Sequence, residues 1–222
     1  MKIENNIVKY YLRDVYFITG TAYAGKSTMV KLLAEKYDMI FCGENYHGEV
    51  AEQVRTPEKQ PALSYFQTMS GWQEFINRTP EEYYRWCLDT AQEATEFEVA
   101  ELIRLSAYGK KIIVDTNISP ELLHEISDYQ HVAVMLSPQS MSVEHFFDRS
   151  DPEKQFLLDQ IREAENPEKT MENFRACIAM INCPEEYERL QKSGFYTIVR
   201  EDVTKDTKME VLEKLERHFN LI

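Results

Sequence analysis

The residues with the clearest chemistry form one short run near the start of the chain. Gly20–Ser27 reads GTAYAGKS and fits the pattern G-x-x-x-x-G-K-[ST]. In this pattern the glycines let the backbone wrap, so that successive amide N–H groups point at anionic oxygens. Lys26 would reach the terminal phosphates of a nucleoside triphosphate, and the hydroxyl of Ser27 would bind Mg²⁺. We expect ATP with Mg²⁺, and the predicted binding residues are Gly20, Thr21, Ala22, Tyr23, Ala24, Gly25, Lys26, Ser27 and Thr28.

This run lies where its chemistry requires, between a strand and a helix. Val15–Thr19 reads VYFIT, a β-branched and aromatic stretch typical of a buried parallel strand. After the run, apolar residues recur at helical spacing and form one stripe: Met29, Val30, Leu32, Leu33 and Tyr37. An ordinary glycine turn before a helix is the alternative, and the strand–loop–helix context favours the phosphate site.

The remaining elements alternate in the order expected of an α/β protein. Further short strands are predicted at 39–42, 112–114, 131–136 and 195–199. Thr79 is followed by proline and two acids, which is typical of a helix start, and this helix should run to about Tyr108. Another helix is predicted over 208–219. The stretch 48–77 indicates short helices and loops, and 137–193 indicates charged helices without a strand. This alternation predicts a parallel sheet covered on both faces, with ligands at the carboxyl ends of its strands.

On the loop and this order of elements, the chain resembles the P-loop kinase group of small-molecule, nucleoside and nucleotide kinases. The resemblance covers nearly the whole chain and implies a three-layer P-loop NTPase fold of the α/β class. That fold has a five-stranded parallel sheet, helices on both faces and a helical lid insertion. The resemblance further implies one domain over 1–222, with an acceptor-binding segment at 44–80 and the lid at 138–193.

Two local features bear on this resemblance. The run IVDTN at Ile113–Asn117 is similar to the third-strand segment of polynucleotide-kinase-like members, which often read D-A-T-N. Tyr23 stands where nucleotide kinases usually carry a third glycine, and its bulk bears on the conformation of the loop.

Two acids follow strands and are candidates for the chemistry. Asp115 ends an apolar strand, where a carboxylate beside the loop could hold Mg²⁺ directly or through water, or could merely cap the next turn. Glu44 follows the second strand, where deoxynucleoside-kinase-like members carry the carboxylate that accepts the proton of the substrate hydroxyl. We prefer Glu44 as general base over a solvated loop acid. His47 ranks second, because a lone histidine in a loop is usually exposed.

Arginines in the region of the implied lid are candidates for stabilising charge on the transferring group. Arg149, Arg162 and Arg175 could act as lid arginines do in the kinases that the chain resembles. Charged helices also carry arginines for solubility and for pairs four residues apart. We favour Arg149, which directly follows the fourth strand at a helix boundary. The predicted catalytic set is Lys26, Glu44, Asp115 and Arg149.

Two further segments could contact ligands. The aromatic group Tyr65, Phe66 and Trp72, with Arg55 and Arg78 nearby, could stack on a flat acceptor. We favour the simpler reading, in which these rings form the core of a small helical subdomain. The residues at 200–204 follow the fifth strand, where related kinases bend a loop around the adenine base.

The overall charge and composition limit the classes of partner that this protein can bind. The formal net charge is −13, from 38 acidic and 25 basic residues, and repels polyanions. We therefore expect no nucleic-acid partner, and a bound phosphate must be held by a local arrangement. The four cysteines show no C-x-x-C pair, which argues against a zinc site or a disulfide framework. Without an apolar signal segment or a long apolar run, we expect no membrane partner and a cytoplasmic protein.

These features predict an ATP-dependent phosphotransferase that acts on a small-molecule acceptor such as a nucleoside or nucleotide. The alternative is a nucleotide-dependent ATPase or switch, whose helical insertion meets a protein partner. The net charge disfavours a polynucleotide kinase, and no guanine-reading N-K-x-D motif follows a strand. The acceptor and the oligomeric state stay open at this stage.

Overall fold

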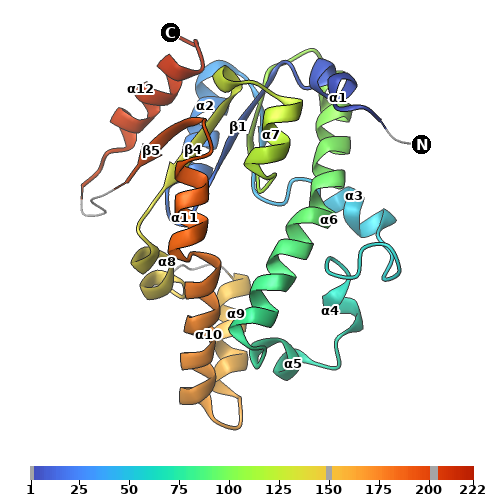
Figure 1. Ribbon diagram of the computed structural model, residues 1–222, viewed down its shortest axis with the longest axis vertical. Helices are drawn as coiled ribbons and strands as arrows, with labels where there is room; N and C mark the ends of the chain where they lie inside the picture. Colours follow the sequence, from blue (N-terminus) through green and yellow to red (C-terminus); the bar gives the residue numbers. More distant parts are fainter. Residues whose placement is uncertain (1–2, 149–151, 201–204) are drawn as a thin grey trace. The chain divides into compact units, whose positions relative to one another are not determined.

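The computed structural model describes residues 3–148, 152–200 and 205–222, and the chain divides into two compact units. The first unit comprises Met1–Val54, Ala94–Ser137 and Tyr187–Ile222. The second comprises Arg55–Glu93 and Pro138–Glu186. Figure 1 traces both units along the chain. Among the described residues, no helix combines the length and apolar character needed to cross a membrane.

The first unit is built on one five-stranded parallel sheet. Its strands are β1 (Val15–Gly20), β2 (Ile40–Cys42), β3 (Ile112–Asp115), β4 (Val132–Leu136) and β5 (Tyr196–Val199). They lie in the order β2-β3-β1-β4-β5, and every neighbouring pair is parallel. Ile18 of β1 pairs with Asp115 on one side and with Ala133 on the other. All five predicted strands are therefore confirmed, each with one end shifted by one residue.

Helices cover both faces of this sheet, as predicted. The helices of the first unit are α1 (Asn5–Tyr11), α2 (Lys26–Tyr37), α3 (Gly48–Val54), the second part of α6 (Pro80–Ser106), α7 (Pro120–Ile126), most of α11 (Pro184–Gln191) and α12 (Lys208–His218), with a short 3-10 turn, η1 (Tyr129–His131). Alternate side chains of β1 separate the two cores, because successive strand residues point to opposite faces. Val15 and Phe17 pack with α1, α6 and α7, whereas Tyr16 and Ile18 pack with α2 and α12. In Figure 1, β5 and α12 form the red end of the chain.

The helix boundaries follow the capping residues of the sequence. The Thr79 hydroxyl accepts a hydrogen bond from the backbone N–H of Glu82 at 3.2 Å, and the Glu82 carboxylate accepts one from the Thr79 N–H at 2.9 Å. This reciprocal pair satisfies two donors at the start of α6. The helix ends at Ser106, shortly before Gly109, whose φ is +68°. α1 was not predicted from the sequence, because only Val8 of this helix is buried and so little of it faces the core.

The second unit is helical in its described part. It contains α4 (Tyr65–Thr68), α5 (Trp72–Ile76), the first part of α6, α8 (Gln139–His145), α9 (Pro152–Arg162) and α10 (Pro167–Ile181). No strand occurs there in the described residues, as predicted for 137–193. Tyr65 and Trp72 pack on a core that includes Phe75 and Phe174, so the core interpretation is confirmed for these two residues. Phe66 contacts the rings of Trp72 and Phe75 but is 43% exposed, at the edge of this core. The guanidinium of Arg78 lies 3.8 Å from the centre of the Tyr65 ring, a cation–π contact.

Candidate functional site

The loop after β1 has a backbone shape that depends on two glycines. Gly20 has φ +133°, and a Cβ there would lie 1.9 Å from the carbonyl oxygen of Met135, so only glycine fits. Gly25 has φ +93° and is the N-cap of α2. Tyr23 adopts a left-handed conformation with φ +64°. This is a backbone conformation that glycine favours, and Tyr23 takes it at a cost of about 1–2 kcal/mol.

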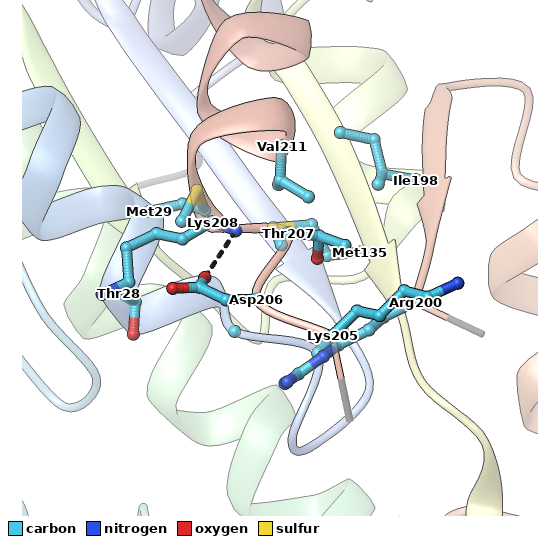
Figure 2. Close-up of a pocket in the computed structure, with 12 residues that line it drawn as sticks. Thr28, Met29, Met135, Ile198, Arg200, Lys205, Asp206, Thr207, Lys208 and Val211 are labelled. Carbon is cyan, nitrogen blue, oxygen red and sulfur yellow. Dashed lines mark hydrogen bonds between the residues drawn. The ribbon is translucent and has the colours of Figure 1, made fainter. Parts of the chain in front are cut away.

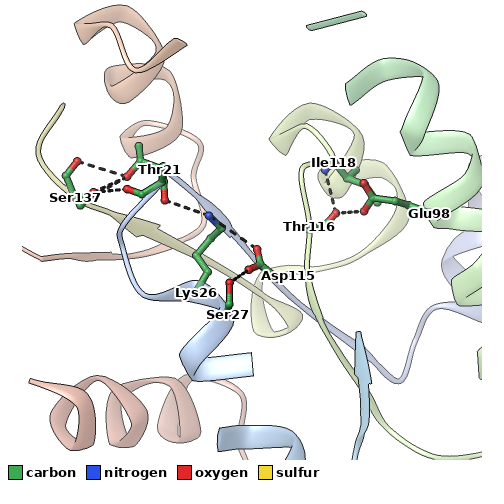
Figure 3. A network of polar contacts seen from close by, with 9 residues as sticks. Thr21, Lys26, Ser27, Glu98, Asp115, Thr116, Ile118 and Ser137 are labelled. Atoms are coloured by element: carbon green, nitrogen blue, oxygen red, sulfur yellow. Dashed lines mark hydrogen bonds and ion pairs between the residues drawn. The ribbon is translucent and has the colours of Figure 1, made fainter. Parts of the chain in front are cut away.

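The first half of the loop is fastened to the end of β4. The backbone N–H of Thr21 donates to the carbonyl oxygen of Met135 at 3.0 Å. The Ser137 N–H donates to the Thr21 hydroxyl at 2.8 Å, and the Ser137 hydroxyl donates to the Ala22 carbonyl at 2.6 Å. Figure 3 shows the contacts between Thr21 and Ser137. The loop is therefore held in place before any ligand binds.

The second half of the loop presents backbone donors. Gly25, the N-cap residue of α2, has no side chain that could accept a hydrogen bond from the helix start. The first N–H groups of a helix also have no acceptor within the helix. Within the described part of the chain, no protein group accepts a hydrogen bond from the N–H of Gly25, Lys26 or Ser27. These donors and the positive end of the α2 dipole favour an anion at this position.

Three predicted residues meet beside this helix start. The Ser27 hydroxyl donates to a carboxylate oxygen of Asp115 at 2.7 Å, and the Lys26 Nζ lies 3.9 Å from the other oxygen. The Lys26 ammonium also donates to the Thr21 carbonyl at 3.1 Å. The contacts are possible because β3 pairs directly with β1, which places the ends of both strands side by side (Figure 3).

Asp115 is almost fully buried, with 5% of its surface exposed. Burial raises the pKa of this carboxyl, while the positive charge of Lys26 and the hydrogen bond from Ser27 lower it. The negative charge of Glu44 raises the pKa of Asp115 further, so Glu44 is close enough to act on this site electrostatically. Glu44 itself is exposed in the turn that follows β2.

The position of His47 corrects the sequence analysis, which expected an exposed histidine. His47 is 6% exposed; it directly precedes α3, and its carbonyl accepts a hydrogen bond from the Ala51 N–H. Burial lowers the pKa of the imidazole, which favours its neutral form. Its Nδ1 is buried, and none of the described residues forms a hydrogen bond with it.

One buried acid near the site was missed by the sequence analysis. Glu98 lies within α6 and is 3% exposed. Its carboxylate accepts a hydrogen bond from the Thr116 hydroxyl at 2.5 Å and one from the Tyr46 hydroxyl at 3.4 Å. Burial raises the pKa of Glu98 to about 7, and the charge of Asp115 adds to this rise. The burial of Glu98 could have been predicted from its spacing of four residues from Ala94 and from Leu102, which are both buried on the same helix.

A pocket of about 180 Å³ lies next to the loop in the first unit (Figure 2). Its lining combines apolar side chains with cationic ones, and Arg200 donates to the Tyr23 carbonyl at 3.3 Å. The lining residues are Ala24, Gly25, Thr28, Met29, Met135, Ile198, Arg200, Lys205, Asp206, Thr207, Lys208 and Val211. The loop predicted to bend around adenine includes 201–204, which lie outside the described residues.

The candidate arginines of the second unit are only partly described. Arg149, the favoured one, lies outside the described residues. Arg162 ends α9, is 65% exposed in its side chain and forms an ion pair with Asp159 at 3.0 Å. Arg175 is exposed on α10. A role for these arginines in the chemistry stays a prediction.

The donor set at Ser27 and Asp115 suits Mg²⁺. These are hard oxygen ligands, and Mg²⁺ is commonly held by one or two protein groups together with substrate phosphates and water. In the described part of the chain, no group of three or more His, Cys, Asp or Glu residues could hold a metal ion. A site shared between the protein and a bound triphosphate is compatible with this finding.

No model of a known protein family matches the chain, and no curated protein matches it. The function of the site is therefore inferred from its own geometry.

Proposed function

We propose that this protein is an ATP-dependent phosphotransferase that acts on a small-molecule acceptor such as a nucleoside or nucleotide. The observation that carries the proposal is the meeting of Lys26, Ser27 and Asp115 at the start of α2. A cation, a hydroxyl and a carboxylate lie there beside backbone N–H groups that have no protein acceptor in the described residues. Phosphoryl transfer depends mainly on such positioning and on charge stabilisation.

The loop would bind the phosphates of ATP. The N–H groups of Gly25, Lys26 and Ser27 would donate to phosphate oxygens, and the Lys26 ammonium would move from the Thr21 carbonyl to the terminal phosphate. Ser27 and Asp115 would hold Mg²⁺. When bound, this ion would neutralise charge on the phosphates.

The pocket in Figure 2 would receive the base of the nucleotide. It adjoins Gly25 and Thr28, so a base there would lie next to phosphates held by the loop. Its volume of about 180 Å³ is below the size usual for a whole drug-sized ligand, and suits one part of a nucleotide. Apolar side chains such as Met29 and Val211 would contact the faces of the ring.

Glu44 is the proposed general base for the acceptor hydroxyl. It follows β2, at the same edge of the sheet as Asp115, and its charge acts on that carboxylate. A base must lie within hydrogen-bond reach of the proton that it removes, and an exposed side chain can turn toward a bound acceptor. His47 is a weaker candidate, because its imidazole is buried.

Two measurements test the proposal. The first is binding of a fluorescent ATP analogue with Mg²⁺ to the wild type, to Lys26→Ala and to the control Lys31→Ala, which removes an exposed lysine of the same helix. We expect loss of binding in Lys26→Ala alone. The second is ADP formation from ATP across a panel of nucleosides, nucleotides and sugars. One acceptor should raise the basal rate strongly.

The outcomes separate the two functional hypotheses. Binding that depends on Lys26, together with a basal rate that no acceptor changes, would contradict the phosphotransferase and favour the nucleotide-dependent switch. Equal binding by the wild type and Lys26→Ala would contradict both, because neither could then use this loop.

A further inference from the structure

A single buried carboxylate contacts both loops that carry the proposed catalytic acids. Asp115 ends β3 and is followed by Thr116, whose hydroxyl donates to Glu98 at 2.5 Å. Glu44 lies two residues before Tyr46, whose hydroxyl donates to the Glu98 carboxylate at 3.4 Å and to the Glu98 carbonyl at 3.2 Å. Glu98 therefore connects the turn after β2 to the turn after β3 through the body of α6.

The contact with Thr116 also sets the backbone of its turn. The Thr116 hydroxyl accepts a hydrogen bond from the N–H of Ile118 at 3.0 Å while it donates to Glu98 (Figure 3). Two donors that follow Asp115 are thus satisfied: the Thr116 hydroxyl by the Glu98 carboxylate, and the Ile118 N–H by the Thr116 hydroxyl.

We propose that Glu98 is a positioning residue, which holds the turns carrying Glu44 and Asp115 in one fixed arrangement. The catalytic part of this inference rests on the proposed function, whereas the structural part does not. Phosphoryl transfer is sensitive to displacements of about 1 Å in the groups around the reacting atoms. The Glu98 side chain is hydrogen-bonded to both turns and therefore limits such displacements.

A purely structural role for Glu98 leads to different predictions. A buried polar group must be hydrogen-bonded wherever it lies, and an apolar residue at this position would avoid the cost of removing a carboxylate from water. If Glu98 only filled the core, its removal would lower stability, and the folded molecules that remain would keep the normal turnover rate. A positioning residue must instead change the local dynamics of both turns and the turnover rate of folded protein.

Hydrogen exchange measured residue by residue tests the structural part without any substrate. In Glu98→Ala we expect the amides of Tyr46–Gly48 and of Asn117–Ile118 to exchange about tenfold faster, equivalent to about 1.4 kcal/mol. Thr116→Val should accelerate only the second group, and Tyr46→Phe only the first. Both variants remove a single hydroxyl, so they keep the test decisive if Glu98→Ala does not fold.

Glu216→Gln is the matched control. Glu216 is as buried as Glu98, but it lies on α12 and forms an ion pair with Lys36 at 2.6 Å. Its substitution should leave exchange in both turns unchanged. Unchanged exchange of both turns in the Glu98, Thr116 and Tyr46 variants would overturn the proposal, as would equal acceleration in Glu216→Gln.

Steady-state kinetics tests the catalytic part, with ATP, Mg²⁺ and the acceptor that the wild type phosphorylates. In Glu98→Ala and Thr116→Val we expect kcat to fall at least about tenfold while the Kd for ATP stays within about twofold. Glu98→Gln retains one acceptor oxygen and should recover part of the loss. A normal kcat together with faster exchange would refute the catalytic role. A wild type that uses no acceptor would refute the proposed function, and exchange would still decide whether Glu98 fixes the turns.

Discussion

The stability of the variant Glu98→Gln, compared with that of the wild type, should increase as the pH rises. Burial raises the pKa of Glu98 from its ordinary value of 4.5 to about 7, so the folded state binds this proton more tightly than the unfolded state does. The resulting stabilisation is fully present below pH 4.5 and is lost as the pH rises through about 7. At about 1.4 kcal/mol for each pH unit, the loss is about 3 kcal/mol.

The assay is urea unfolding of the wild type and Glu98→Gln at several values between pH 4.5 and pH 8. Glutamine does not ionise, so the variant avoids the cost of burying a charge at high pH. The free energy of unfolding of the variant minus that of the wild type should therefore rise by about 3 kcal/mol across this range. Subtraction removes the contribution of other titrating groups and any constant cost of the lost hydrogen bond.

Two results bear on this reasoning. A difference that stays flat within about 1 kcal/mol, or falls toward high pH, would refute the argument that burial raises the pKa of Glu98. Glu216→Gln provides the contrast, because it removes a buried carboxylate that is paired with Lys36. Its loss leaves the lysine without that partner, so this variant should be less stable than the wild type at pH 8.

Three further variants, with Gly109→Ala as a control, examine the loop and its neighbours. Lys26→Ala should weaken ATP binding at least about tenfold, measured by titration of a fluorescent analogue, because it removes a charge-assisted contact to phosphate. Asp115→Asn should raise the Mg²⁺ concentration needed for half-maximal ATP binding by about 10- to 100-fold, since a charge-assisted contact contributes about 1.5–3 kcal/mol. Gly20→Ala should lower the free energy of unfolding in urea by about 3 kcal/mol or more, because its Cβ would lie 1.9 Å from the Met135 carbonyl oxygen. Gly109→Ala has a positive φ but no atom within 4 Å of the added carbon, and should cost only about 1–2 kcal/mol; equal losses in the two glycine variants would contradict the clash.

Local sequence patterns sufficed for most of the secondary structure. The five strands were predictable because short apolar runs that are rich in β-branched and aromatic residues and bounded by turn residues favour strands over helices. The capping pair of Thr79 and Glu82 predicted the start of α6, since both hydrogen bonds lie within one turn of the chain. α1 was missed, because a helix with one buried residue carries almost no periodic signal.

The environments of single polar residues were harder to predict. His47 was expected to be exposed, because it follows a short polar stretch of the chain, and it is buried. Glu98 was not singled out among 38 acids, although its spacing from Ala94 and Leu102 places it on the buried stripe of α6. In both cases burial depends on which elements pack over the side chain, and the local sequence does not specify that packing.

Local patterns in the sequence were enough to predict the strand, the glycine-rich loop and the helix that follows it. These features depend on residues within about twenty positions of one another, and on backbone geometry that only glycine permits at Gly20. Which of the two candidate acids contacts that loop depended instead on the order of the strands in the sheet. Asp115 lies 88 residues from Ser27 and reaches it at 2.7 Å because β3, rather than another strand, pairs with β1. Strand order is set by the packing of the whole sheet and its helices, and no local pattern specifies it.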